Sequence, residues 1–158
     1  MNGIDIRDLL RTDHETALAD LEALRLEADS RRALQMLEKM RRSWVIHALA
    51  EETVVYRALE GAEAMSDDPK AQADERFIEH ELVGGLFDRI AQARCGTLEW
   101  KARLNVVRDI MSRHMESEHA DLFRQLAERF DAGQLCELGR RFVSARDKLA
   151  LLERAKAA

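Results

Sequence analysis

Apolar residues recur at steps of three and four positions along five stretches of the chain, which is the spacing of one face of an α-helix. No stretch sustains the strict alternation of apolar and polar residues that indicates a β-strand. We expect Ser30 to cap the second helix and Ser66–Pro69 to be the strongest break in the chain. The pattern predicts helices over about residues 4–28, 30–61, 71–94, 98–130 and 134–157.

The connections between these helices are short, which favours antiparallel packing of neighbours. We therefore predict an all-α fold, an up-down-up-down four-helix bundle with an additional C-terminal helix packed outside it. Two helical hairpins, at about residues 4–62 and 71–130, form the bundle, and the accessory helix covers about residues 134–157. All 158 residues are expected to form a single domain, since a chain of this length can bury one core.

Composition narrows the classes of function. The formal charge of −5, with Lys and Arg residues interspersed among acidic ones, argues against nucleic-acid binding. The apolar stretches are too short to span a bilayer, and the first ten residues lack the basic and apolar layout of a secretory signal, so we expect no membrane association. Cys95 and Cys136 form no CxxC pair and no disulfide framework, which favours a cytoplasmic protein whose thiols are not needed for metal binding.

Histidines occupy equivalent places in the two hairpins. His14 and His47 fall on the apolar faces of the first and second helices, and His80 and His114 fall on those of the third and fourth. The separation within each pair is almost the same, so each hairpin carries one histidine on each arm at a similar height. Two such hairpins facing each other would bring four imidazoles into one core.

The second arm of each hairpin also carries a glutamate four positions after its histidine, at Glu51 and Glu118. Four residues advance a helix by about 6 Å and rotate it by about 40°, so the histidine and the glutamate project from one face. No Lys or Arg is expected on these inner faces, and burying a carboxylate without a cationic partner costs on the order of several kcal/mol. Two metal ions would supply the missing charge. A buried hydrogen-bonded network without metal is the competing interpretation.

Four imidazoles and two carboxylates form a mixed nitrogen and oxygen donor set that suits iron, and less exclusively manganese or zinc. A closed structural zinc site uses four ligands, usually with thiolates, so six convergent ligands favour a dinuclear centre. The predicted metal ligands are His14, His47, Glu51, His80, His114 and Glu118.

In this order and spacing the sequence resembles the hemerythrin-like family, also called the HHE cation-binding domain, over about residues 5–130. The resemblance implies a four-helix bundle with two iron ions, each held by one histidine pair and bridged by both glutamates and an oxo or hydroxo group. It is carried by Asp13-His14, His47-x-x-x-Glu51-Glu52, Glu79-His80 and His114-x-x-x-Glu118.

Two positions differ from the oxygen-carrying members of that family. Those members have a further histidine one turn after the position of His80, where this chain has Gly84. They also place the acid of the fourth helix five positions after the histidine that corresponds to His114, where this chain has His119. Both differences match the family's other branch, which has one histidine fewer, and they argue against reversible oxygen carriage. Whether His119 or Glu81 also binds metal stays open.

Residues near the ligands have expected roles of their own. Gly84 and Gly85 indicate either space for a small ligand or close helix packing. Tyr56, about 180° round the helix from His47, is expected to face away from the metals. Acids beside the ligands are expected to be exposed or to hydrogen-bond an imidazole, namely Glu52, Glu79, Glu81 and Glu116.

The leading functional hypothesis is a redox-active di-iron protein that reacts with dioxygen, hydrogen peroxide or nitric oxide in an oxidative-stress role. The sequence leaves open whether it is an enzyme, with catalase-like peroxide decomposition or an oxidase reaction as the candidates. The alternative is an iron or oxygen sensing or storage protein that signals metal occupancy to a partner. The C-terminal helix exceeds what a four-helix bundle needs, so it is the surface expected to contact a partner or a second copy of the chain.

Overall fold

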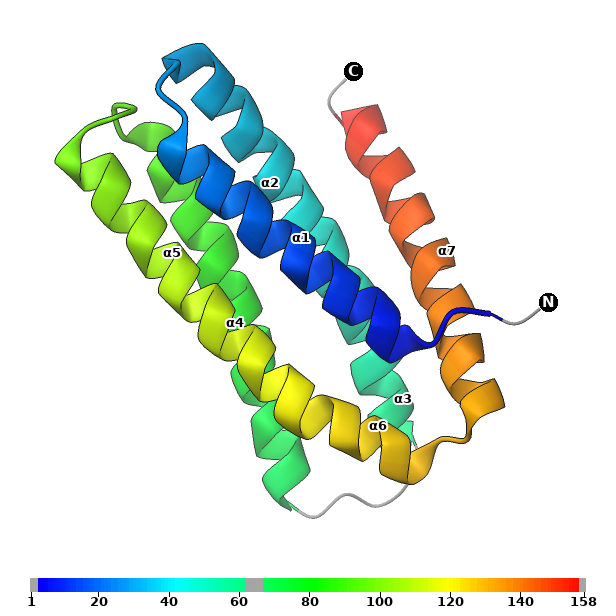
Figure 1. Ribbon diagram of the computed structural model, residues 1–158. Coiled ribbons are helices and arrows are strands. Elements are labelled where there is room, and N and C mark those ends of the chain that lie inside the picture. The colour runs from blue at the N-terminus through cyan, green and yellow to red at the C-terminus, as the bar shows by residue number, and fades with distance from the viewer. Residues whose placement is uncertain (1–2, 62–66, 157–158) are drawn as a thin grey trace.

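The structure, a computed structural model, describes residues 3–61 and 67–156, and these contain helices and no strand, as predicted. Four long helices run side by side, and a further helix lies against them (Figure 1). Two of the long helices are built from three consecutive segments each. The elements in chain order are α1 (Ile6–Leu26), α2 (Ser30–Glu51), η1 (Glu52–Tyr56), α3 (Arg57–Gly61), α4 (Asp67–Gln92), α5 (Leu98–Ser117), η2 (Glu118–Leu122), α6 (Phe123–Arg129) and α7 (Ala132–Lys156).

Two predicted boundaries need correction. Asp29, not Ser30, caps α2, because its Oδ1 accepts a hydrogen bond from the backbone N–H of Arg32 at 2.8 Å. Of the predicted break, Ser66 lies outside the described residues. The remaining residues, Asp67–Pro69, belong to the first turn of α4, where a proline's missing N–H removes no helical hydrogen bond.

The second and fourth long helices each contain a π-helical segment that the apolar pattern does not predict. Segment η1 starts directly after Glu51, and η2 starts at Glu118 itself. A π turn takes about one residue more than an α turn, so each segment rotates the residues that follow it relative to those before it. Both glutamates singled out from the sequence therefore lie at a junction between α and π geometry.

The core consists of two apolar clusters stacked along the bundle. One gathers around Trp44, Phe87 and Met111, and the other around Leu10, Leu122 and further apolar residues of α1, η1 and α6. Along each long helix the polar residues at the centre of the bundle fall between the two clusters. A layer of buried histidines and glutamates thus separates two apolar halves.

Helix α7 packs against α1 and α2 on the outside of the bundle (Figure 1). It is more than an accessory surface, because Phe142 is 0% exposed and belongs to the same apolar cluster as Leu10. The N-terminal segment crosses α7 so closely at Gly139 that a Cβ there would overlap the carbonyl oxygen of Ile4. Among the residues described, no helix is long and apolar enough to cross a membrane.

Candidate metal centre

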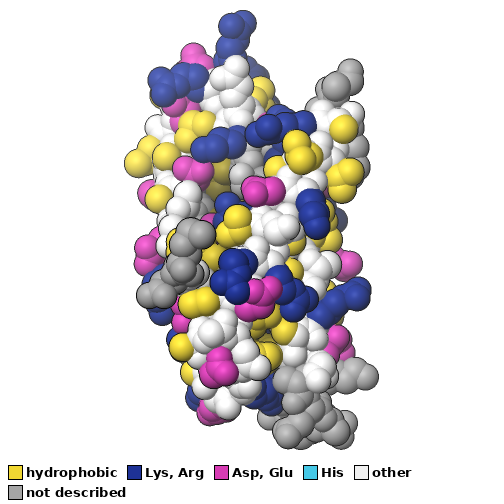
Figure 2. All heavy atoms as spheres, turned by 90° about the vertical axis from the view of Figure 1, so that its right-hand side faces the viewer, with side chains coloured by type: hydrophobic (Ala, Val, Ile, Leu, Met, Phe, Trp, Pro, Cys, Tyr) yellow, Lys and Arg dark blue, Asp and Glu magenta, His cyan; other side chains and the backbone are white. Residues whose placement is uncertain are grey.

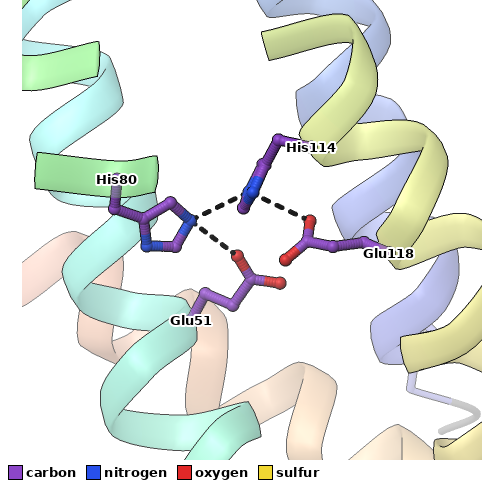
Figure 3. Close-up of side chains that lie close together, drawn as sticks. All are labelled: Glu51, His80, His114 and Glu118. Carbon is purple, nitrogen blue, oxygen red and sulfur yellow. Dashed lines mark hydrogen bonds and ion pairs between the residues drawn. The ribbon is translucent and has the colours of Figure 1, made fainter. Parts of the chain in front are cut away.

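The six predicted ligands meet in the polar layer between the two apolar clusters. They come from α1, α2, α4, α5 and the first residue of η2. Each is between 0 and 7% exposed, so all six are shielded from solvent. Figure 3 shows four of them, Glu51, His80, His114 and Glu118, pointing toward one another.

The four imidazoles form two pairs, each bringing two Nε2 atoms together. The Nε2 atoms of His14 and His47 are 3.2 Å apart, and those of His80 and His114 are 3.0 Å apart. Both pairs join neighbouring arms of one predicted hairpin. In each pair the nitrogens converge on a shared point, as ligands of one metal ion must.

Each carboxylate lies between the two histidine pairs. Oε2 of Glu51 is 3.5 Å from Nε2 of His47 and 3.6 Å from Nε2 of His80. Oε2 of Glu118 is 3.4 Å from Nε2 of both His14 and His114. Each glutamate therefore contacts one histidine of each pair, which is the arrangement that two metal ions bridged by two carboxylates require.

Three of the four oxygens of these two carboxylates are buried without a hydrogen-bond donor. Both oxygens of Glu51 and Oε2 of Glu118 have no hydrogen-bond partner. A buried carboxylate without such partners destabilises a fold by on the order of several kcal/mol, unless a cation compensates its negative charge. The donor set and its unsatisfied oxygens thus fit a pair of cations.

In the metal-free site, protonated imidazoles are the positive charges nearest the two carboxylates, and contacts with Asp13 and Glu51 outweigh burial and raise the pKa of His47 to about 10. Burial, followed by the charge of His47, lowers the pKa of His14 to about 3. Burial and the nearby charge of Glu51 raise the pKa of Glu118. Burial would also raise the pKa of Glu51, but the interaction with His47 and the other imidazoles outweighs it and lowers that pKa to about 2. Two carboxylates this close ionise together only when positive charge lies between them.

A carboxylate holds the outer nitrogen of three of the four imidazoles. Nδ1 of His80 lies 2.8 Å from Oε1 of Glu52, and Nδ1 of His114 lies 2.8 Å from Oε2 of Glu79. Nδ1 of His47 lies 3.2 Å from Oδ2 of Asp13. Such a partner fixes the ring orientation and keeps Nε2 directed at the centre.

The chain matches the model of one protein family. The hemerythrin HHE cation-binding domain matches residues 5–126, which is most of the chain and includes all six convergent residues. The chain belongs to the hemerythrin HHE family. No curated protein matches it.

In this hemerythrin-like protein the acids near the predicted ligands fall into two groups. Glu52 and Glu79 each hydrogen-bond an imidazole, whereas Glu81 and Glu116 are exposed. His119 lies behind His14, with its Nε2 3.1 Å from Nδ1 of that residue, which is the side away from the other ligands. The structure therefore places His119 as an outer neighbour of the candidate ligand His14.

The expectation for Tyr56 is wrong. Its hydroxyl donates a hydrogen bond of 2.6 Å to Oε1 of Glu118, and its ring stacks on His80 at a centroid distance of 6.0 Å. The cause is η1, because the extra residue in the π turn rotates Tyr56 back toward the face that carries Glu51. Burial, together with the charge of Glu118, raises the pKa of Tyr56 well above its usual value, so the hydroxyl keeps its proton.

The expectation that the inner faces carry no cation is also wrong for α4. Arg76 lies one turn before His80 and is only 5% exposed. Its charge acts on Tyr56, where it lowers the pKa against the larger effects that raise it. It does not provide hydrogen bonds to the three unpartnered oxygens of Glu51 and Glu118.

The two adjacent glycines of α4 do not serve close helix packing. A Cβ at Gly84 or Gly85 would meet no other part of the protein within 4 Å. Close helix packing is therefore excluded at these two positions, and space for a small ligand beside the metals stays a prediction. Gly84, one turn after His80, is partly exposed and Gly85 is exposed, and neither lines the cavity that reaches His14 and His47.

Proposed function

We propose that this protein holds two iron ions and belongs to the branch of the family with one histidine fewer than the oxygen carriers. His14 and His47 would bind one ion, His80 and His114 the other, and Glu51 and Glu118 would bridge them. The observation that carries the proposal is that each fully buried glutamate contacts one histidine of each pair.

The proposed activity is reaction with dioxygen, hydrogen peroxide or nitric oxide, with peroxide decomposition as the enzymatic form. Bound iron would supply the redox chemistry and Lewis acidity for such a reaction. The chain's own residues orient the imidazoles, exclude bulk water and keep a proton on the Tyr56 hydroxyl beside Glu118. Gly84 leaves open the space that a further histidine would fill.

Metal analysis of freshly purified protein, combined with an absorption spectrum, tests the centre. We expect two irons per chain, and we expect Glu51→Ala and Glu118→Ala each to lose both ions together, because each carboxylate bridges. Glu116→Ala, an exposed acid beside the same site, is the matched control and should keep both. Full iron content in either bridging variant would show that the assignment is wrong.

Gly84→His tests the reactivity separately from metal content. An imidazole at this position would fill the space beside the His80 side of the centre, so peroxide consumption should slow while two irons remain bound. Reversible oxygen uptake by the unaltered protein, with peroxide left untouched, would exclude the proposed activity in favour of oxygen carriage.

A second candidate function, sensing or storage of iron or oxygen, is favoured by one contact. Arg146 of α7 donates to both carboxylate oxygens of Asp13 at 2.7 Å, and Asp13 contacts Nδ1 of His47. Metal occupancy at His47 would then alter the packing of α7, which could signal to a partner protein or a second copy of the chain. Amide hydrogen exchange of α7 with and without iron tests this, and equal exchange in both states rejects the sensor.

A further inference from the structure

A cavity of about 300 Å³ lies between α1, α2 and α7. Its outer wall comes from α7, including Arg146 and Ala150, and its inner walls come from the bundle. Figure 2 looks onto the face that carries α7, where hydrophobic side chains are recessed in a hollow of the upper half. The cavity is therefore open to solvent on one side and reaches the core on the other.

The inner end of this cavity is formed by one half of the candidate metal centre. His14 and His47 line it, whereas His80 and His114 are not among its lining residues. The walls between the mouth and the two imidazoles are mainly apolar side chains that also belong to, or pack against, the apolar cluster around Trp44. They include Ala17, Met40, Trp44, Phe87, Met111 and Met115.

The charged groups of the cavity favour a neutral occupant. Its described cations are already paired. Arg146 lies 2.7 Å from Asp13 and Lys39 lies 3.4 Å from Asp20. His47, whose contacts with Asp13 and Glu51 raise its pKa to about 10 against the effect of burial, lies 3.2 and 3.5 Å from those two acids. The remaining charged side chain is Asp147, an exposed acid. An anion entering here would find no unpaired cation among the described lining residues, while an uncharged apolar molecule would gain contact with the walls.

The size of the cavity exceeds what a diatomic gas or peroxide occupies. A water molecule takes about 30 Å³ of the liquid, and an apolar cavity of about 150 Å³ is sufficient to bind benzene. Sites for small organic ligands begin at about 300 Å³. The space is therefore sufficient for a ring-sized organic molecule in addition to any small ligand of the metals.

We propose that this cavity binds a small neutral organic molecule of about one aromatic ring, with its ring between α1, α2 and α7 and its polar end toward His14 and His47. Such a molecule would be a second reactant at the metal centre, and in this respect the proposal rests on the proposed function. Binding in the cavity itself requires only the fold.

Phenol binding to the metal-free protein, measured by isothermal titration calorimetry, tests the cavity independently of iron. Ala17→Phe places a ring in the cavity from α1 and should weaken phenol binding by at least about tenfold. Ala19→Phe, on the exposed face of the same helix, is the matched control and should bind phenol like the unaltered protein. Ala150→Phe fills the cavity from α7 instead, so the result does not depend on one variant folding.

Absence of phenol binding at millimolar concentration, or equal binding in both filled variants and the control, would overturn the proposal.

The iron-loaded protein then tests the position of the bound molecule. Phenol should weaken azide binding, followed by the azide-to-iron absorption band, and this effect should disappear in Ala17→Phe. If phenol binds the metal-free protein but leaves azide binding unchanged, the cavity does not adjoin the metals and the second part of the proposal is wrong. A chain that binds phenol but holds no iron would contradict the proposed function and leave the cavity assignment standing.

Discussion

At the scale of single residues, the candidate centre depends on side chains that stand behind the ligands. The acids next to His14 and His80 in the sequence do not serve those histidines, because Asp13 contacts His47 and Glu79 contacts His114. In each hairpin the first arm therefore orients the imidazole of the second arm. This support couples the two helices of a hairpin at the level of the candidate metal centre.

Removing one supporting acid should weaken metal binding without removing a ligand. Glu52→Ala takes away the partner of Nδ1 of His80, so we expect iron affinity to fall by about 10- to 100-fold. Glu81→Ala, an exposed acid close to the same histidine, is the control and should leave affinity unchanged. Competition with a chelator of known iron affinity measures both variants, and equal affinities would mean that Glu52 does not support the ligand.

Tyr56→Phe should destabilise the metal-free protein. The substitution leaves Oε1 of Glu118 buried without its hydrogen-bond donor, an effect of about 1–3 kcal/mol on the free energy of unfolding. Urea denaturation measures the loss. A double-mutant cycle with Glu118→Gln separates the hydrogen bond from other effects of the hydroxyl, and strictly additive losses would mean that the two groups are not coupled.

The metal-free protein should also become less stable as the pH falls from about 6.5 toward 3. In the unfolded chain His14 gains a proton near pH 6.5, whereas burial and the charge of His47 lower its pKa in the folded protein to about 3. The unfolded state therefore binds more protons in this window, and the free energy of unfolding falls by up to about 1.4 kcal/mol per pH unit. His14→Gln should flatten this slope in denaturation curves recorded across the window, and an unchanged slope would assign the acid sensitivity to other groups.

At the scale of elements, the crossing of the N-terminal segment over α7 depends on one glycine. Gly139→Ala places a Cβ against the carbonyl oxygen of Ile4, so the backbone must move, and we expect a loss of about 1–3 kcal/mol. Gly85→Ala is the opposite case, because nothing lies within 4 Å of the new methyl group. Alanine favours the helix there, and this variant should gain about 0.5–1 kcal/mol. Thermal denaturation of both variants checks the signs, and losses of equal size would contradict the geometry.

The helices and the six convergent residues could be predicted from the sequence because both depend on α-helical periodicity. His47 and Glu51, like His114 and Glu118, precede or meet the π segments, so the regular spacing still holds for them. Tyr56 lies beyond the irregularity, and its position could not be predicted from regular spacing. The only available signal was that a lone tyrosine sits five positions after a buried glutamate, which has no meaning until the π turn is known.

The contribution of α7 to the site could not be predicted from the sequence either. Its amphipathic pattern predicts a helix that packs somewhere, but periodicity does not identify the partner of Arg146. The ion pair with Asp13 joins residues at opposite ends of the chain and depends on tertiary packing alone. Cys136 illustrates the same limit, since its thiol donates to the carbonyl oxygen of Gly3 at 3.1 Å.

At the scale of the whole molecule, the layer of buried histidines and glutamates separates two apolar clusters, and metal bound there should hold them together. Removing iron by chelation should lower the melting temperature of the protein. A metal that binds only the folded state adds about 2.7 kcal/mol to the free energy of unfolding when its free concentration is 100 times its Kd. Calorimetry before and after chelation measures the change. A variant with both Cys95→Ser and Cys136→Ser should keep its iron and show the same fall. An unchanged melting temperature after complete iron loss would show that the layer needs no metal.

The outer wall of the cavity can change without any change in the predicted metal ligands. The family match ends at residue 126, before α7 begins, yet α7 supplies Arg146 and Ala150 to the space beside His14 and His47. The predicted metal ligands and the part of the cavity wall that α7 forms are thus encoded in separate stretches of the chain. Substitutions at positions such as Ala150 would therefore change what the cavity admits while every predicted ligand stays in place, whereas Phe142, fully buried in the core, ties the rest of α7 to the fold.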